Sequence, residues 1–144
     1  MITRAITTAI EVANTKDWNK TYWAFDIHGT IIYPNWEHGN IPTEFYPYAK
    51  EVLQIITSRE DITTLLFTCS HPDELPVYID LFKKNGIDFD YVNENPEVEN
   101  ERYGHYDKKP YFNVFFEDKA GFDPLQDWEA VLELLKTCFD KVEG

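Results

Sequence analysis

Blocks of apolar residues along the chain alternate with blocks in which apolar and polar positions repeat at helical spacing. Some blocks are almost continuously apolar or aromatic and show no helical period. Runs of this kind are typical of strands buried on both faces of a parallel sheet. The predicted strands are residues 21–27, 62–68, 89–93 and 111–116.

Other blocks place apolar residues three and four positions apart, which predicts helices with one buried face. The predicted helices are residues 43–58, 70–86 and 124–140, together with a weakly patterned opening at 1–18. Ser70 is a candidate cap for the second of these, and Gly86 is a candidate stop. The clearest stripe is in 124–140, and it consists of Leu125, Trp128, Val131, Leu132, Leu135 and Phe139.

This order of elements predicts an α/β fold, a Rossmann-like parallel sheet with helices on both faces. The chain has 144 residues, of which 43% are hydrophobic, enough for one core but too few for two domains. We therefore expect a single domain over 1–144, with a core at 20–140 and an N-terminal extension at 1–18 in which Ile6, Ala9, Ile10 and Ala13 share one face.

Charge and patterning restrict the partners of this protein. The formal net charge is −13, which repels phosphate backbones and argues against nucleic acid. A bound divalent cation would reverse the sign locally, so a small phosphorylated molecule remains compatible with this charge. No signal peptide or apolar span is visible, and Cys69 and Cys138 lie far apart, so we expect a soluble cytoplasmic protein without a disulfide framework.

Chemically active side chains recur at the carboxyl ends of the predicted strands, the edge at which parallel α/β sheets bind ligands. They are Asp26, Thr68, Glu117 and Asp118, with Lys109 just before the last strand. Carboxylates of this kind suit Mg²⁺, and a carboxylate can also attack phosphorus. A hydroxyl and an ammonium group can hold phosphoryl oxygens, where charge is spread in the transition state.

The same residues carry a family resemblance. "FDIHGT" at 25–30, "LLFT" at 65–68, "KKP" at 108–110 and "FFED" at 115–118 follow one another in the order of four motifs. From residue 20 onward the chain resembles the haloacid dehalogenase (HAD) superfamily of phosphohydrolases. The resemblance implies Mg²⁺-dependent hydrolysis of a phosphomonoester through an aspartyl-phosphate.

The resemblance also implies a role for each matching residue. Asp26 would be the nucleophile and a metal ligand, and Asp118 and the backbone carbonyl of His28 would complete the protein ligands. Glu117 would lie beside Asp118 and either support the ligands or bind the metal through water. The phosphoryl group would be bound by Thr68 and neutralised by Lys109.

His28 departs from the family pattern, which has a second acid at this position. Imidazole can protonate a leaving alkoxide and later accept a proton from water. Its proximity to Mg²⁺ would weaken the acid role. Two interpretations therefore stay open: an enzyme that uses His28 as its acid and base, or a catalytically silent HAD-fold binding or regulatory protein.

For individual residues, alternatives to a catalytic role remain open. Asp26 could be a strand-end turn residue, Thr68 could cap the next helix, and Lys108 competes with Lys109. The segments between the motifs are too short for a cap domain. We therefore expect an uncapped protein whose site is either open or covered by a neighbouring subunit, with a small phosphoester as substrate.

Overall fold

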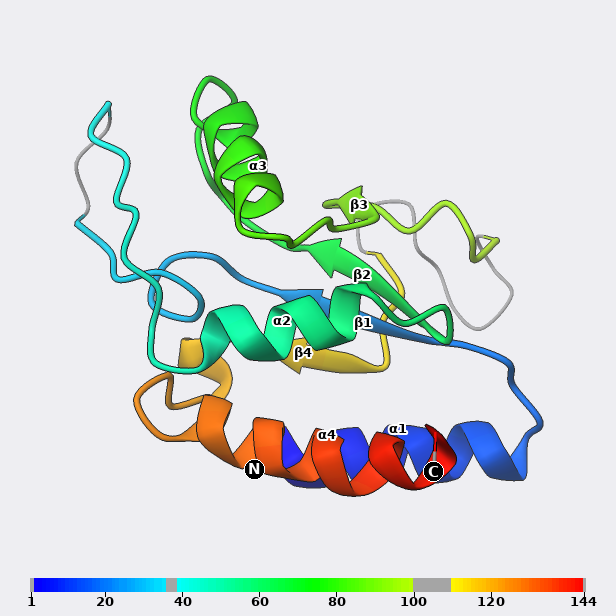
Figure 1. The fold of residues 1–144 in the computed structure, drawn as a ribbon. Coiled ribbons are helices and arrows are strands. Elements are labelled where there is room, and N and C mark those ends of the chain that lie inside the picture. Colours follow the sequence, from blue (N-terminus) through cyan, green and yellow to red (C-terminus); the bar gives the residue numbers. More distant parts are fainter. Residues whose placement is uncertain (1, 36–38, 100–109, 144) are drawn as a thin grey trace.

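The computed structural model describes residues 2–35, 39–99 and 110–143 (Figure 1). The elements follow the predicted alternation of strands and helices. In chain order they are α1 (Ile2–Thr15), β1 (Thr21–Phe25), α2 (Ala49–Thr57), β2 (Ile62–Leu66), α3 (Leu75–Lys84), β3 (Tyr91–Val92), β4 (Val114–Phe116), the short 3₁₀ helix η1 (Asp118–Ala120) and α4 (Asp127–Glu143).

The four strands form one parallel sheet in the order β3-β2-β1-β4, which confirms the predicted α/β class. Phe25, the last residue of β1, is paired with Leu66 of β2 and with Phe116 of β4. Because these three strands end in register, the residues that follow them leave the sheet at one edge. This register places the motif residues near one another.

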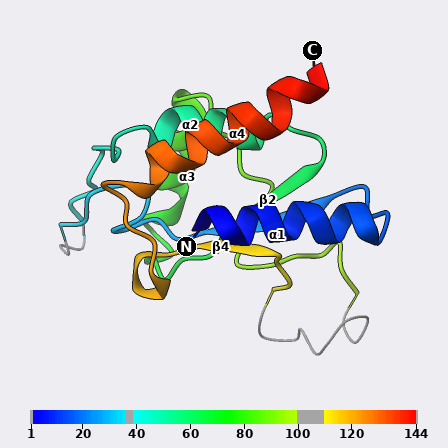
Figure 2. The ribbon, with the colours of Figure 1, turned by 90° about the horizontal axis from the view of Figure 1, so that it is seen from below.

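Helices α1, α2 and α4 form one layer against the sheet, since α4 contacts both α1 and α2 (Figures 1 and 2). The core between this layer and the sheet is built on aromatic rings. Phe116 stacks on Phe25 and on Trp128, with ring centroids 4.5 and 5.4 Å apart. The N-terminal helix belongs to this core, because Ile6 is fully buried in it.

The opposite face of the sheet is lined differently. Ala24 and Leu65 are fully buried there, and the ring of Phe115 contacts those of Phe67 and Phe112. Non-helical chain contributes to this side, since Glu97, in the connection between β3 and β4, accepts a hydrogen bond from Tyr91. In the described residues, α1, α2 and α4 therefore cover one face of the sheet, whereas non-helical chain contributes to the other.

Two helices begin later than the periodicity predicts. Helix α2 begins at Ala49 instead of residue 43, because Tyr48 adopts a left-handed conformation (φ 68°) and Phe45 pairs with Ile32 in an isolated bridge. Helix α3 begins at Leu75 instead of residue 70. Its N-cap is Glu74, so the predicted capping role of Ser70 is wrong.

Helix α4 is confirmed, but Leu125 does not belong to its buried stripe. Leu125 lies before the helix and is 64% exposed, because the Asp123 carboxylate accepts a hydrogen bond from its backbone N–H in the turn that starts the helix. Val131 and Leu135 are buried as predicted. None of the helices in the described parts of the chain is both long and apolar enough to cross a membrane.

Candidate active site

Three carboxyl groups converge at the edge where β1 and β4 end. One oxygen from each of Asp26, Glu117 and Asp118 lies within 4.8 Å of the others. The three side chains line a cavity of about 750 Å³, whose wall also includes His28 and Thr68. The structure therefore brings together five of the six side chains that the sequence singled out.

Backbone and side-chain hydrogen bonds fix the positions of these acids. The Asp26 N–H donates to the carbonyl of Phe116 at 3.0 Å, which holds the end of β1 against β4. The Asp118 N–H donates to Oγ1 of Thr30 at 3.2 Å. Thr30 is itself anchored, because Nε1 of Trp128 donates to its carbonyl at 2.7 Å in the core. The first and fourth motifs are thereby tied to each other and to α4.

Two independent features of this loop favour glycine at position 29. Its φ is +75°, a conformation that residues with a side chain rarely adopt. A Cβ atom at this position would also lie 2.8 Å from Oδ2 of Asp118. The glycine of the first motif therefore allows the loop to turn while the carboxylate of Asp118 lies directly against it.

The electrostatics of the cluster disfavour three ionised acids. Burial, followed by the negative charges of Glu117 and Asp118, raises the pKa of Asp26 from 3.8 to about 6. A hydrogen bond from the Ile27 backbone and the positive charge of Lys119 partly oppose this rise. Burial and a hydrogen bond with Asp118 likewise raise the pKa of Glu117. A cation between these oxygens would relieve the repulsion.

His28 faces the cavity beside a buried tyrosine and a buried acid. Its Nε2 is hydrogen-bonded to the hydroxyl of Tyr78 at 2.6 Å, and the two rings meet edge to face. Burial lowers the pKa of His28, although the charge of Glu74 partly opposes this. Burial therefore favours the neutral ring, which suits a base better than an acid.

Thr68 lies on the cavity wall two residues beyond the end of β2. Its hydroxyl accepts a hydrogen bond from the Ser70 N–H at 3.1 Å and is 2.8 Å from the Ser70 hydroxyl. The side-chain amide of Asn93 accepts a hydrogen bond from the Thr68 N–H at 2.8 Å and donates one to the Thr68 carbonyl at 3.0 Å. The hydroxyl thus stabilises a local turn, not the first turn of α3, and remains at the wall of the cavity.

Lys109 lies outside the described residues. Lys119 does line the cavity, and its charge acts on Asp26. Sequence reasoning missed this lysine, although it directly follows Glu117-Asp118. It also missed Tyr78, Glu74 and Asn93, because nothing in the helical or strand pattern distinguishes a core side chain from one that reaches the site.

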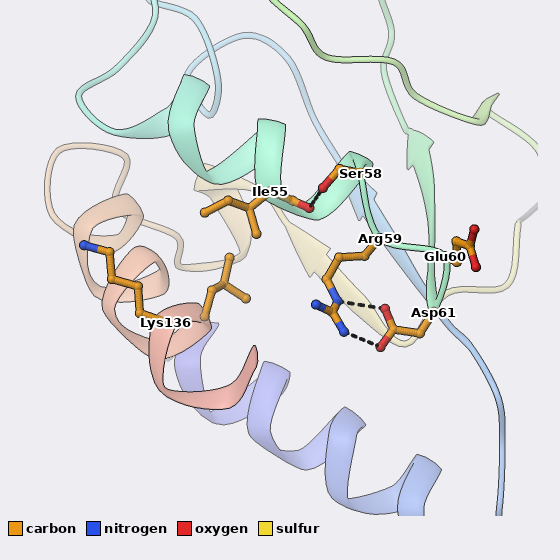
Figure 3. A pocket seen from close by; sticks show the side chains of 7 residues that line it. Ile55, Ser58, Arg59, Glu60, Asp61 and Lys136 are labelled. Carbon is orange, nitrogen blue, oxygen red and sulfur yellow. Dashed lines mark hydrogen bonds and ion pairs between the residues drawn. The ribbon is translucent and has the colours of Figure 1, made fainter. Parts of the chain in front are cut away.

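A second hollow, of about 590 Å³, lies between the end of α2 and helix α4, near the start of β2 (Figure 3). Its most prominent cation is already engaged. Arg59 makes a two-pronged ion pair with Asp61 at 2.9 and 3.1 Å, and its guanidinium lies 3.6 Å from the ring centroid of Phe139. These contacts favour a structural role for Arg59.

Comparison with known proteins supports the fold. No protein-family model and no curated protein matches the chain. One solved structure, of a conserved protein coded by a locus from Bacteroides thetaiotaomicron, is similar with a TM-score of 0.62 and 22% sequence identity. The match covers 88% of this chain and 99% of that one. At this identity the similarity shows that the two chains share a fold.

Proposed function

We propose that this protein is a Mg²⁺-dependent phosphohydrolase that acts on small phosphomonoesters. The observation that supports this most is the convergence of Asp26, Glu117 and Asp118, whose oxygens lie within 4.8 Å at the carboxyl edge of a parallel sheet. These residues come from the first and fourth of four motifs that resemble those of the HAD superfamily.

The donor set fits Mg²⁺. All three side chains offer carboxylate oxygens, the hard ligands that this ion prefers, and the ion usually takes only one or two carboxylates and keeps several waters. Asp26 and Asp118 would hold the ion, with the His28 carbonyl, and Glu117 would support it. When bound, Mg²⁺ would neutralise charge on the phosphoryl oxygens.

The side chains can divide the reaction between them. The ionised carboxylate of Asp26 attacks phosphorus, forming an O–P bond while the bond to the leaving oxygen breaks. The imidazolium form of His28 gives its proton to that oxygen and becomes the neutral ring. The neutral ring of His28 then accepts a proton from the water that attacks the aspartyl-phosphate, which frees Asp26 and inorganic phosphate. Thr68 and Lys119, which line the cavity, would bind phosphoryl oxygens.

One observation favours a second candidate, a binding or regulatory protein without turnover. Burial lowers the pKa of His28, which disfavours the imidazolium form that would protonate a leaving group. Such a protein would bind a phosphorylated ligand in the same cavity but would not cleave it.

Asp26→Asn separates the two candidates. A panel of phosphomonoesters is assayed with Mg²⁺ and with EDTA, and exposed Asp88, which lies outside the cavity, is changed to Asn as the matched control. We expect activity that needs Mg²⁺, survives Asp88→Asn and is lost in Asp26→Asn. Equal trace activity of the wild type and Asp26→Asn on every substrate would reject the enzyme proposal.

The role of His28 is tested on the best substrate from that panel. We expect His28→Ala to lower the rate by roughly a hundredfold or more, and His28→Asp to retain activity with a different pH–rate profile. An inert wild type that gains activity only in His28→Asp would show that His28 marks lost catalysis. If both the wild type and His28→Asp are inert, the binding candidate is correct.

A further inference from the structure

The phenol of Tyr78 connects the hydrophobic core to the candidate acid–base residue. Tyr78 lies in α3 and is only 1% exposed. Its hydroxyl is 2.6 Å from Nε2 of His28, and the ring centroids are 5.1 Å apart at an interplanar angle of 84°. Two residues that are 50 positions apart in sequence are thus joined by one short hydrogen bond.

The two partners differ in how firmly they are held. The Tyr78 ring is enclosed by the core, whereas His28 lies in the loop that follows β1 and faces the cavity. A buried tyrosine hydroxyl must find a hydrogen-bond partner, and here that partner is a side chain of the cavity wall. The hydrogen bond therefore restricts the rotation of the imidazole much more than that of the phenol.

The residue that caps the start of α3 is itself held by a hydrogen bond. Glu74, four residues before Tyr78, is 8% exposed, and its Oε2 accepts a hydrogen bond from the Gly39 N–H at 2.9 Å. Glu74 also lines the cavity. Because residues four apart lie on the same face of a helix, Glu74 and Tyr78 present one anchored edge of α3 to the site.

We propose that Tyr78 is a positioning residue, which holds the imidazole of His28 in the orientation needed for proton transfer. This inference rests on the proposed hydrolase function. In this role Tyr78 contacts neither the phosphoryl group nor the oxygens that would ligate the metal, and it acts only through the imidazole of His28. A misplaced proton donor slows chemistry much more than it weakens substrate binding, since the interaction matters most in the transition state.

Tyr78→Phe removes the hydroxyl and keeps the ring. We expect kcat to fall about tenfold or more while KM stays within about twofold. In a His28→Ala background the same change should have no further effect on kcat. Tyr91→Phe is the matched control, because it also deletes a tyrosine hydroxyl that is hydrogen-bonded to a side chain, Glu97, outside the cavity.

A second readout does not need turnover. With ¹⁵N-labelled histidine, the ring nitrogen shifts of His28 should change in Tyr78→Phe and stay unchanged in Tyr91→Phe. Unchanged shifts in Tyr78→Phe would overturn the proposal.

The kinetic outcomes separate this proposal from the function on which it rests. Wild-type kcat in Tyr78→Phe, with activity still lost in Asp26→Asn, would reject the role of Tyr78 alone. An equal loss with and without His28 would also reject it, because the effect would then bypass the imidazole. If the wild type shows no turnover that depends on Asp26, the hydrolase function and this catalytic role fall together.

Discussion

Asp26→Asn should stabilise the metal-free protein, although it should abolish activity. The carboxylate is half-buried and faces two further acids, so its ionised form is disfavoured in the folded state. Asparagine has nearly the same shape and carries no charge, and its carbonyl can still accept the hydrogen bond from Ile27. The substitution therefore removes a charge that burial and the two neighbouring acids disfavour, and it keeps the packing.

The magnitude follows from the pKa of Asp26, which is raised from 3.8 to about 6. At 1.36 kcal/mol per pH unit, this rise corresponds to at most about 3 kcal/mol, and solvent screening of a half-exposed group reduces it to about 1–2 kcal/mol. For a chain of this size the melting temperature of Asp26→Asn should exceed that of the wild type by about 3–6 °C at pH 8.

The pH dependence has a definite sign. Because the folded-state pKa is the higher one, the native protein binds more protons than the unfolded chain between pH 3.8 and about 6. Asp26 therefore contributes a loss of stability as the pH rises through this window, and the full penalty is present above it. The advantage of Asp26→Asn should grow from about pH 4.5 to pH 7 and then level off.

Thermal unfolding in EDTA at several pH values measures this effect, with Asp88→Asn as the matched control. Added Mg²⁺ should raise the melting temperature of the wild type, because binding to the native state stabilises it, and should have little effect on Asp26→Asn. A variant that is less stable than the wild type at pH 8 in EDTA would refute the electrostatic reasoning. So would an advantage that does not depend on pH.

Two further substitutions test how the loop after β1 holds the acids. Gly29→Ala should weaken Mg²⁺ binding, measured by titration, tenfold or more, because the new Cβ displaces Asp118. Gly121→Ala is the control. Gly121 also has a positive φ (+104°) but open space around it, so this change should carry only the conformational cost. Equal metal affinity in the two variants would contradict this. Trp128→Phe should lower the free energy of unfolding by about 2–4 kcal/mol in urea, because it leaves the buried Thr30 carbonyl without its donor and opens a void. A loss below 0.5 kcal/mol would show that this link is not structural.

Local patterns in the sequence determined the strands, the class of the fold and the positions of the acids. Asp26 follows an apolar run, and so does Glu117-Asp118. A strand that is covered on both faces must be apolar, so its reactive polar side chains lie just beyond its end. Parallel pairing then brings those ends to one edge. The positions of these acids depend on the local sequence and not on individual side-chain contacts.

Tertiary structure decided what depends on contacts between distant segments. The pairing of Phe45 with Ile32 delays the start of α2 against its own periodicity, since a helix boundary reflects competition with other partners. The hydrogen bond between Tyr78 and His28 could not be predicted from sequence either, because it also joins distant segments. Tyr78 has the spacing of an ordinary core residue, and only the folded chain shows that its hydroxyl reaches the cavity.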